Sequence, residues 1–338
     1  MKQKELFSLC CGVAAMTALI LDCSTALSGA ANGIELCLRS VIPTLFPFLV
    51  LSIFLTGQLS AMKISCLRPI GKLLHMPENT EIIFLLGLLG GYPMGAQCIR
   101  QAYDAGKLSR ADAQRMLCFC SNAGPAFLFG IGMMLFENLR HCWMVWGIHI
   151  FSAILIGMFV PAEKPRVTTS TPSQRTTITE AVRNAANVMI MICSWIVLFR
   201  ILLTFLGKWL ARLLPGSVFI FLCGLLELTN GCDLLMSVPS LQHRIIIFSI
   251  FLGFGGFCVA LQTSAVLAGS DLSIKSYFLG KLAQSVISCI LGCVLFSVEL
   301  YGYRRLCLIT MGVILVVAFL FCRKKRNCGS FPETYRVY

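Results

Sequence analysis

Charged residues are scarce in this sequence. Of its 338 residues, 13% are charged and 57% are hydrophobic, and the mean hydropathy is +0.82. Soluble globular domains carry about 25% charged residues, so this chain has too few to cover a water-soluble surface. The composition therefore excludes a soluble fold and predicts an all-α polytopic membrane protein.

Acidic residues are fewer than basic ones. There are 15 Asp and Glu against 28 Lys and Arg, which gives a formal net charge of +13. Such an excess can indicate nucleic-acid binding, but here most of it lies between long apolar runs, where it reports topology. The basic run at 323–326 fits an anchor on anionic lipid. We expect membrane lipids as partners and no nucleic acid.

The motifs of most catalytic and metal sites are missing. The sequence has no HExxH, no GxSxG and no GxxxxGK[ST], and no Asp pairs lie inside the apolar runs. Its 18 cysteines form no CxxC pair, and many lie in apolar runs, where Cys behaves as a small hydrophobe. The four histidines are scattered without metal spacing: His75, His141, His149 and His243. The sequence predicts neither an enzyme nor a resident cofactor.

Long apolar runs dominate the chain. A spanning helix needs about 20 mostly apolar residues. Eight runs meet this need, at 6–28, 41–61, 112–136, 143–161, 181–206, 244–270, 275–298 and 305–322. Two further apolar stretches, 82–100 and 217–236, are short or broken: Gly-Gly-Tyr-Pro-Met-Gly at 90–95 interrupts the first and Glu-Leu-Thr-Asn-Gly at 227–231 the second. We interpret both as re-entrant or broken helices that do not cross, because opened backbone at membrane depth must be buried in protein or line a wet cavity.

The positive charges give an orientation to eight crossings. With both termini cytoplasmic, 19 Lys and Arg fall on the cytoplasmic side and 7 on the outer side, and Arg200 and Lys281 lie within spans. This asymmetry agrees with the positive-inside rule. The sequence therefore predicts a multi-pass protein of the cell membrane with both ends in the cytoplasm.

A polar segment divides the chain into two similar halves. Residues 161–180 are rich in Thr, Ser and Pro and predict a flexible cytoplasmic linker between a first helical repeat at 1–160 and a second at 181–322, with a basic tail at 323–338. Each half has a span, a broken segment with Gly-Leu-Leu (87–89 and 224–226) and a span with a Gly-rich break. Three crossings between the starts of the units would invert the second, as in many secondary transporters with a midplane site. The alternative is a likeness of composition alone.

The break of the first stretch offers candidate binding residues. Gly91, Tyr92, Pro93 and Gly95 force an unwound turn whose N–H groups would attract an anion, and Tyr92 could stack on a planar ring or plug the hairpin tip. A tight packing turn is the alternative.

A second break in the first half contains Asn122, Gly124 and Pro125. The Asn122 carboxamide could bind a ligand or cap the reopened helix.

Glu227 is the candidate ion-coupling residue. A carboxylate inside an apolar run is costly and marks an ion or proton site by default. With Thr229 and Asn230 it could hold a coupling Na⁺ or carry a proton, and Gln262 adds a polar group from the following span. The alternative is a structural salt bridge from Glu227 to Lys281 or Arg200.

Arg200 and Lys281 are candidates for holding a substrate carboxylate. Both could instead extend to a membrane interface, which is the more common fate of a basic residue in a span.

Four motifs together resemble the sporulation integral membrane protein family of the YlbJ type. They are Pro-Thr-Leu-Phe-Pro-Phe at 43–48, Gly-Tyr-Pro-Met-Gly-Ala at 91–96, Cys-Ser-Asn-Ala-Gly-Pro at 120–125 and Glu-Leu-Thr-Asn-Gly at 227–231. The likeness spans about 35–300. Two positions depart from the family pattern: Gly90 stands where the family more often has Ser, and Ser121 where it has Asn.

The resemblance implies nucleoside-recognition or "gate" domains and a role in sporulation, moving dipicolinate across the outer forespore membrane. We therefore expect a permease for a small polar or anionic heteroaromatic solute, most specifically dipicolinate. The alternatives are a carrier of nucleosides or other small solutes, and a membrane scaffold for spore envelope assembly that transports nothing. A homo-oligomer is compatible with each.

Overall fold

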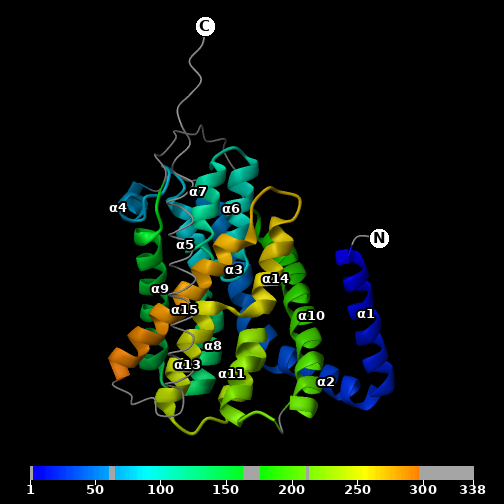
Figure 1. Cartoon of the computed structure of the whole chain (residues 1–338). Helices are drawn as coiled ribbons and strands as arrows, with labels where there is room; N and C mark the ends of the chain where they lie inside the picture. Colours follow the sequence, from blue (N-terminus) through cyan, green and yellow to red (C-terminus); the bar gives the residue numbers. More distant parts are fainter. Residues whose placement is uncertain (1–2, 61–64, 163–175, 211–212, 297–338) are drawn as a thin grey trace, which may run out of the picture.

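The protein is a bundle of helices in the computed structural model, which describes residues 3–60, 65–162, 176–210 and 213–296 (Figure 1). No strand occurs within these ranges, so the predicted all-α class is confirmed. The predicted span 305–322, most of the linker and the basic tail lie outside them. The α-helices are α1 (Gln3–Leu21), α2 (Cys23–Leu36), α3 (Ile42–Ser60), α4 (Arg68–Leu73), α5 (Glu81–Gly90), α6 (Met94–Asp104), α7 (Arg110–Met116), α8 (Pro125–Phe136), α9 (Leu139–Phe159), α10 (Ile178–Leu210), α11 (Gly216–Leu226), α12 (Leu228–Leu235), α13 (Leu241–Phe254), α14 (Gly256–Leu267) and α15 (Ile274–Phe296).

Five continuous helical stretches in the described part of the chain are long and apolar enough to cross a membrane. They are Cys23–Leu55, Leu139–Phe159, Ile178–Leu210, Leu241–Leu267 and Ile274–Leu295. The stretch Leu241–Leu267, which joins α13 and α14, is the most enclosed, with 83% of its apolar window buried, so it forms the centre of the bundle. A multi-pass membrane protein is thereby supported, while the count of eight crossings stays a prediction.

The region of the first predicted span differs from expectation. Residues 6–28 do not form one continuous helix, because α1 ends at Leu21 and α2 begins after Asp22. The Asp22 carboxylate caps α2 by accepting a hydrogen bond from the Thr25 backbone N–H at 3.3 Å. In Figure 1, α1 stands apart from the bundle and α2 runs obliquely along the lower end. The Lys208 ammonium also bonds Asp22 and lowers the pKa of that carboxyl to about 2, which fixes the start of α2 against α10.

Close backbone contact holds α2 and α3 antiparallel to α10. A Cβ on Gly33 would lie 3.0 Å from the Val197 Cα, and one on Gly29 would lie 2.9 Å from the Ile201 Cα. At the far end of α3, the Gln58 side chain donates to the Thr176 carbonyl at 2.8 Å, just before α10 begins. Small residues let helix backbones approach in this way, and the contact explains why the chain turns at Asp22.

The elements after α2 follow the same order in both halves. In the first half, α3 precedes the packed pair α5–α6, then α7 and α8 on either side of the break at 117–124, then α9. In the second half, α10 precedes the packed pair α11–α12, then α13 and α14 on either side of Gly255, then α15. The helices open within the predicted breaks: residues 91–93 separate α5 from α6, and Glu227 alone separates α11 from α12, whose first turn takes up 228–231.

Glycines at matching positions let each short pair close. A Cβ on Gly87 would overlap the Cys120 carbonyl oxygen and approach Gly95, and a Cβ on Gly231 would overlap Gly224. The pairs α5–α6 and α11–α12 therefore pack backbone to backbone.

We expect the substitution Gly87→Ala to destabilise the fold by about 2–3 kcal/mol, because the neighbour is backbone that cannot rotate away. The matched control is Gly147→Ala in α9, where nothing lies within 4 Å of an added Cβ. That substitution should be neutral or slightly stabilising. Thermal unfolding of the two purified variants in detergent tests this, and equal melting temperatures would contradict the close approach at Gly87.

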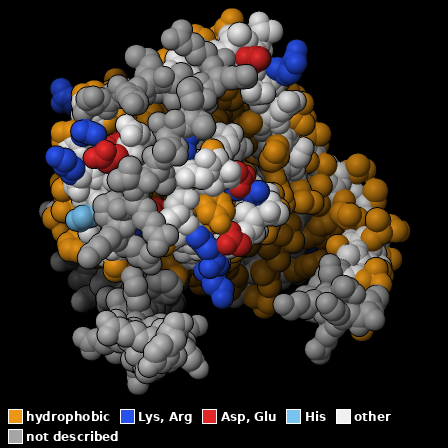
Figure 2. Space-filling view, turned by 90° about the horizontal axis from the view of Figure 1, so that it is seen from above, with side chains coloured by type: hydrophobic (Ala, Val, Ile, Leu, Met, Phe, Trp, Pro, Cys, Tyr) orange, Lys and Arg blue, Asp and Glu red, His pale blue; other side chains and the backbone are white. Residues whose placement is uncertain are grey.

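Charged side chains gather on the upper end of the molecule. Seen from above, Lys, Arg, Asp and Glu side chains gather on the upper end and hydrophobic side chains surround them (Figure 2). Helices α4, α6 and α7 lie at this upper end (Figure 1). Segments predicted to be cytoplasmic, 68–72 and 100–115, lie at this end, and the apolar sides fit a bundle embedded in a bilayer.

Candidate functional site

Four helix breaks meet in the centre of the bundle. In the first half, Gly91 adopts a φ of 72° after α5, and Pro125 restarts the chain as the first residue of α8. In the second half, α12 begins directly after Glu227, and Gly255, with a φ of 79°, separates α13 from α14. Only glycine adopts these positive φ values without strain, so the sequence fixes where the helices open.

The breaks touch in pairs. A Cβ on Gly91 would lie 3.0 Å from the Gly124 backbone nitrogen, and one on Gly256 would lie 3.3 Å from the Leu228 backbone nitrogen. Each short helix pair thus meets the broken span of its own half.

Tyr92 connects the two halves. Its hydroxyl donates to the Leu252 carbonyl at 2.9 Å, and its ring packs against Gly255, the break of the second-half span. The side chain is therefore shared between the first short helix pair and the central helix α13–α14.

A cavity of about 80 Å³ lies where the breaks meet. One water needs about 10–15 Å³ of such space, so the cavity can hold several waters or a small solute. Its walls are α3, α10, α14 and three of the breaks, those at Gly91, Gly124 and Glu227. Its lining residues are Leu45, Phe48, Leu49, Ser52, Leu89, Gly90, Gly91, Tyr92, Ala123, Gly124, Ala126, Phe127, Ile192, Ile196, Glu227, Leu228, Thr229, Val259 and Gln262. Mostly apolar walls with a few converging polar groups are typical of a small-molecule site.

Among the described residues, Glu227 is the only charged one in that lining, and it is 3% exposed. Its carboxylate accepts from the Thr229 N–H at 3.0 Å, from the Asn230 N–H at 2.6 Å and from the Asn230 side-chain amide at 2.7 Å. The carboxylate caps the N-terminus of α12, and the Glu227 residue also lines the cavity. No ion pair joins it to Arg200 or Lys281 among the described side chains, so the alternative of a structural salt bridge is not what this region shows.

Arg200 is connected to the cavity-lining Glu227 through Asn230. Its guanidinium pairs with Asp233 at 3.0 Å and donates to the Asn230 carboxamide oxygen at 3.1 Å. A polar chain therefore runs from Asp233 through Arg200 and Asn230 to Glu227. A second, small cavity of about 10 Å³ borders Asp233 and shares Thr229 with the central one.

Lys281 is the centre of a separate buried cluster. Its ammonium donates to the Gln284 carboxamide oxygen at 2.5 Å and to the Asn122 carboxamide oxygen at 3.4 Å. Gln284 also donates to Asn122 at 3.1 Å and to the His149 carbonyl at 3.1 Å, and the His149 ring accepts from the Ala123 N–H at 3.0 Å. The cluster ties α9 and α15 to the break at 117–124.

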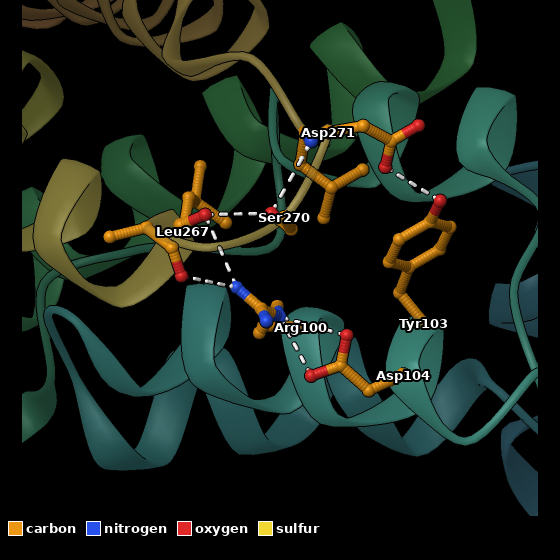
Figure 3. Close-up of polar contacts among 8 residues, drawn as sticks. Arg100, Tyr103, Asp104, Leu267, Ser270 and Asp271 are labelled. Atoms are coloured by element: carbon orange, nitrogen blue, oxygen red, sulfur yellow. Dashed lines mark hydrogen bonds and ion pairs between the residues drawn. The ribbon is translucent and has the colours of Figure 1, made fainter.

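Polar contacts join α6 to the end of α14 at the upper end of the bundle (Figure 3). The Arg100 guanidinium donates to the carbonyls of Leu267 and Ala268 at 3.2 and 2.8 Å and pairs with Asp104 at 2.7 Å. The Tyr103 hydroxyl donates to Asp271 at 2.7 Å, a bond that raises the pKa of the tyrosine. Arg110 also pairs with Asp271 at 3.0 Å. The two halves are therefore joined at the upper end.

Six of the predicted site residues line the cavity: Gly91, Tyr92, Gly124, Glu227, Thr229 and Gln262. Seven do not: Pro93, Gly95, Asn122, Pro125, Asn230, Arg200 and Lys281. Pro93 and Gly95 lie at the start of α6, and Pro125 opens α8 directly behind the lining. The remaining four belong to the two polar clusters. Three polar residues could not be identified as part of the site from the sequence, because a single polar residue in an apolar run carries no distinguishing pattern: Ser52, His149 and Gln284.

The two helix N-termini at the cavity differ electrostatically. The start of α12 is capped by Glu227, whereas no side chain caps the start of α8, whose first turn contributes Ala126 and Phe127 to the lining. The wall formed by α8 therefore presents the positive end of a helix, and the opposite wall presents a carboxylate. The described residues contain no group of three or more His, Cys, Asp or Glu side chains placed to hold a metal ion.

Fold and site together define a polytopic helical membrane protein with a mostly apolar cavity between broken helices, into which a few polar groups converge. The chain is 23% identical over 307 residues to the sporulation integral membrane protein YlbJ of Bacillus subtilis, covering 77% of this chain and 74% of the relative. The predicted resemblance to the YlbJ-type family is thereby confirmed. No family model matches the chain, and no solved structure matches it.

Proposed function

We propose that this protein is a permease for a small polar or anionic heteroaromatic solute, and that the solute is dipicolinate during spore formation. The observation that carries the proposal is the cavity at the meeting point of four helix breaks, lined by Glu227, Thr229 and Gln262. Opened backbone inside a membrane bundle is tolerated where it lines a cavity, and transporters place their substrates there. The relative's name supports the assignment to sporulation.

The proposal includes an inverted repeat. The two halves, proposed as domains at 1–160 and 181–322, have the same order of elements, and the antiparallel packing of α3 on α10 is the relation that inversion requires. In Figure 1, α3 rises from the lower end while α10 descends to it, which agrees with inversion. Rocking of one half against the other would open the site to each side in turn.

Each wall of the cavity has a separate task in this mechanism. A solute carboxylate would lie at the uncapped N-terminus of α8, beside Gly124, because that helix end is positive. The ring of Tyr92 offers a face for a planar heteroaromatic ring. Glu227 and Thr229 on the opposite wall would bind the coupling Na⁺ or proton that offsets the solute's charge.

A second candidate is a neutral heteroaromatic solute such as a nucleoside. One observation favours it: the only charged lining residue is a carboxylate, which repels an anion unless a cation accompanies that anion. A scaffold that transports nothing is the third candidate, and it would leave the polar lining without a task.

The orientation follows from the charge distribution. We propose eight crossings with both termini in the cytoplasm, in the cell membrane and, in a sporulating cell, in the outer forespore membrane. A fluorescent protein fused after Gly106 should then fluoresce in the cytoplasm, and alkaline phosphatase fused after Asn138 should be active outside. The reverse pattern would contradict the assigned orientation.

Uptake by purified protein in proteoliposomes tests the transport function. We expect saturable uptake of labelled dipicolinate under an imposed Na⁺ or proton gradient, with labelled uridine as comparator. Uridine uptake without dipicolinate uptake would identify a nucleoside carrier. No uptake or exchange of either solute by folded protein would favour the scaffold.

A further inference from the structure

Lys281 occupies a position that the permease mechanism above does not use. It lies in α15 with none of its surface exposed, behind the wall of the cavity. Its ammonium lies 5.4 Å from the centre of the Tyr92 ring, and Tyr92 lines the cavity. One aromatic side chain therefore separates a fully buried lysine from the solute site.

The groups around Lys281 do not neutralise its charge. Its hydrogen-bond acceptors are the carboxamide oxygens of Gln284 and Asn122, and none of the ion pairs among the described residues includes it. The titratable groups that face it from the surrounding elements are Tyr92 and Tyr277, the thiols of Cys118 and Cys120, and His149 beyond Gln284. None of these side chains normally carries a negative charge at neutral pH. An uncompensated buried charge is costly, so this site favours exchange of the proton whenever water reaches it.

The Tyr92 side chain lies between Lys281 and the cavity and packs against both hydrophobic clusters of the bundle. One hydrogen bond, from the Tyr92 hydroxyl to the Leu252 carbonyl, secures it against α13. The ring packs against the break at Gly255, and Tyr92 directly follows the turn at Gly91; both glycines have positive φ. Tyr92 is thus placed at the points where the two halves would move against each other.

Proton loss at Lys281 would reach the cavity through Asn122. In its ammonium form the lysine donates to Asn122, whose neighbours Ala123 and Gly124 line the cavity. As a neutral amine the lysine has one N–H fewer to donate and no positive charge. Its hydrogen bond to Asn122, in the break at 117–124, is then weaker. The state of the proton is therefore linked to the wall that would hold the solute.

We propose that Lys281 is a proton-binding site through which solute movement is coupled to a proton gradient. When Tyr92 turns away, the ammonium gives its proton to water in the cavity, and the amine takes a proton from water on the other side of the membrane in the opposite state. This coupling rests on the permease function proposed above. In it, Lys281 is a second titrating group beside Glu227.

Accumulation and exchange distinguish coupling from transport itself. Proteoliposomes with the membrane potential clamped at zero would be given a gradient of one pH unit, and steady accumulation of the transported solute would be measured beside its exchange at equal pH. One proton per solute gives about tenfold accumulation per pH unit. We expect wild-type protein to show both activities, and Lys281→Gln to lose accumulation while retaining exchange.

Two further variants separate titration from structure. Lys281→Arg keeps a positive charge that does not titrate, so it should also lose accumulation, whereas a purely structural cation would be replaced by arginine without loss. Lys275→Gln changes an exposed lysine on the same helix and should behave as wild type. Undiminished tenfold accumulation by Lys281→Gln or Lys281→Arg would overturn the proposal. If wild-type protein exchanges solute but does not accumulate it, the proton coupling is overturned and the permease function stands. If wild-type protein shows neither exchange nor accumulation, the permease function is overturned as well.

Discussion

Replacing Glu227 by Gln is expected to reduce solute uptake by roughly tenfold to hundredfold while the protein stays folded. The carboxylate now accepts three hydrogen bonds from Thr229 and Asn230 and is the only charged group in the cavity lining. Glutamine keeps one acceptor oxygen for the start of α12 but removes the negative charge that would hold a coupling cation. Initial uptake rates in proteoliposomes measure the effect.

The control for this substitution is Glu137→Gln. Glu137 is an exposed residue after α8, outside the cavity lining, and its neutralisation should leave uptake within about twofold of wild type. Equal uptake by wild type and Glu227→Gln would contradict a coupling role for Glu227 and would favour the scaffold or an uncoupled carrier.

Replacing Arg115 by Met is expected to destabilise the protein by about 3–5 kcal/mol. Arg115 lies at the end of α7, is 5% exposed and donates to the carbonyls of Leu74, His75, Gly157 and Val160. Methionine fills similar space but leaves these buried acceptors without a donor. Because α7 leads directly into the break at 117–124, the lost contacts would also loosen the cavity wall. Thermal unfolding with and without solute measures both effects.

Arg110 provides a matched control in the same helix. Its side chain is 63% exposed and pairs with Asp271 on the surface. Exposed ion pairs contribute about 0–1 kcal/mol, so Arg110→Met should shift the melting temperature far less than Arg115→Met. Similar shifts for the two variants would show that the bonds of Arg115 to the four carbonyls add no special stability.

Several features of the site could be predicted because they depend on local chemistry. Glycine, proline and glutamate inside apolar runs interrupt helices wherever the chain places them, and this located the breaks at Gly91, Gly124 and Glu227 without a structure. The order of elements in the halves followed from the same patterns.

The sequence did not predict the helix α2. An apolar run continues through Asp22, and hydropathy alone joins the residues on both sides into one span. The turn depends on the contact of Gly29 and Gly33 with the backbone of α10. These segments are about 170 residues apart in the sequence, so local patterns do not reveal the contact.

By itself the sequence determined the class of the protein, the positions of its helix breaks and the identity of Glu227 as a buried carboxylate, because hydrophobicity and backbone preference are properties of each residue and its neighbours. Only the tertiary structure decided which polar groups meet: Arg200 with Asp233, Lys281 with Asn122 and Gln284, and Tyr92 with the break of the other half. These pairings join residues that are 33 to 160 positions apart or lie on the buried face of one helix, and only close packing brings such groups within bonding distance.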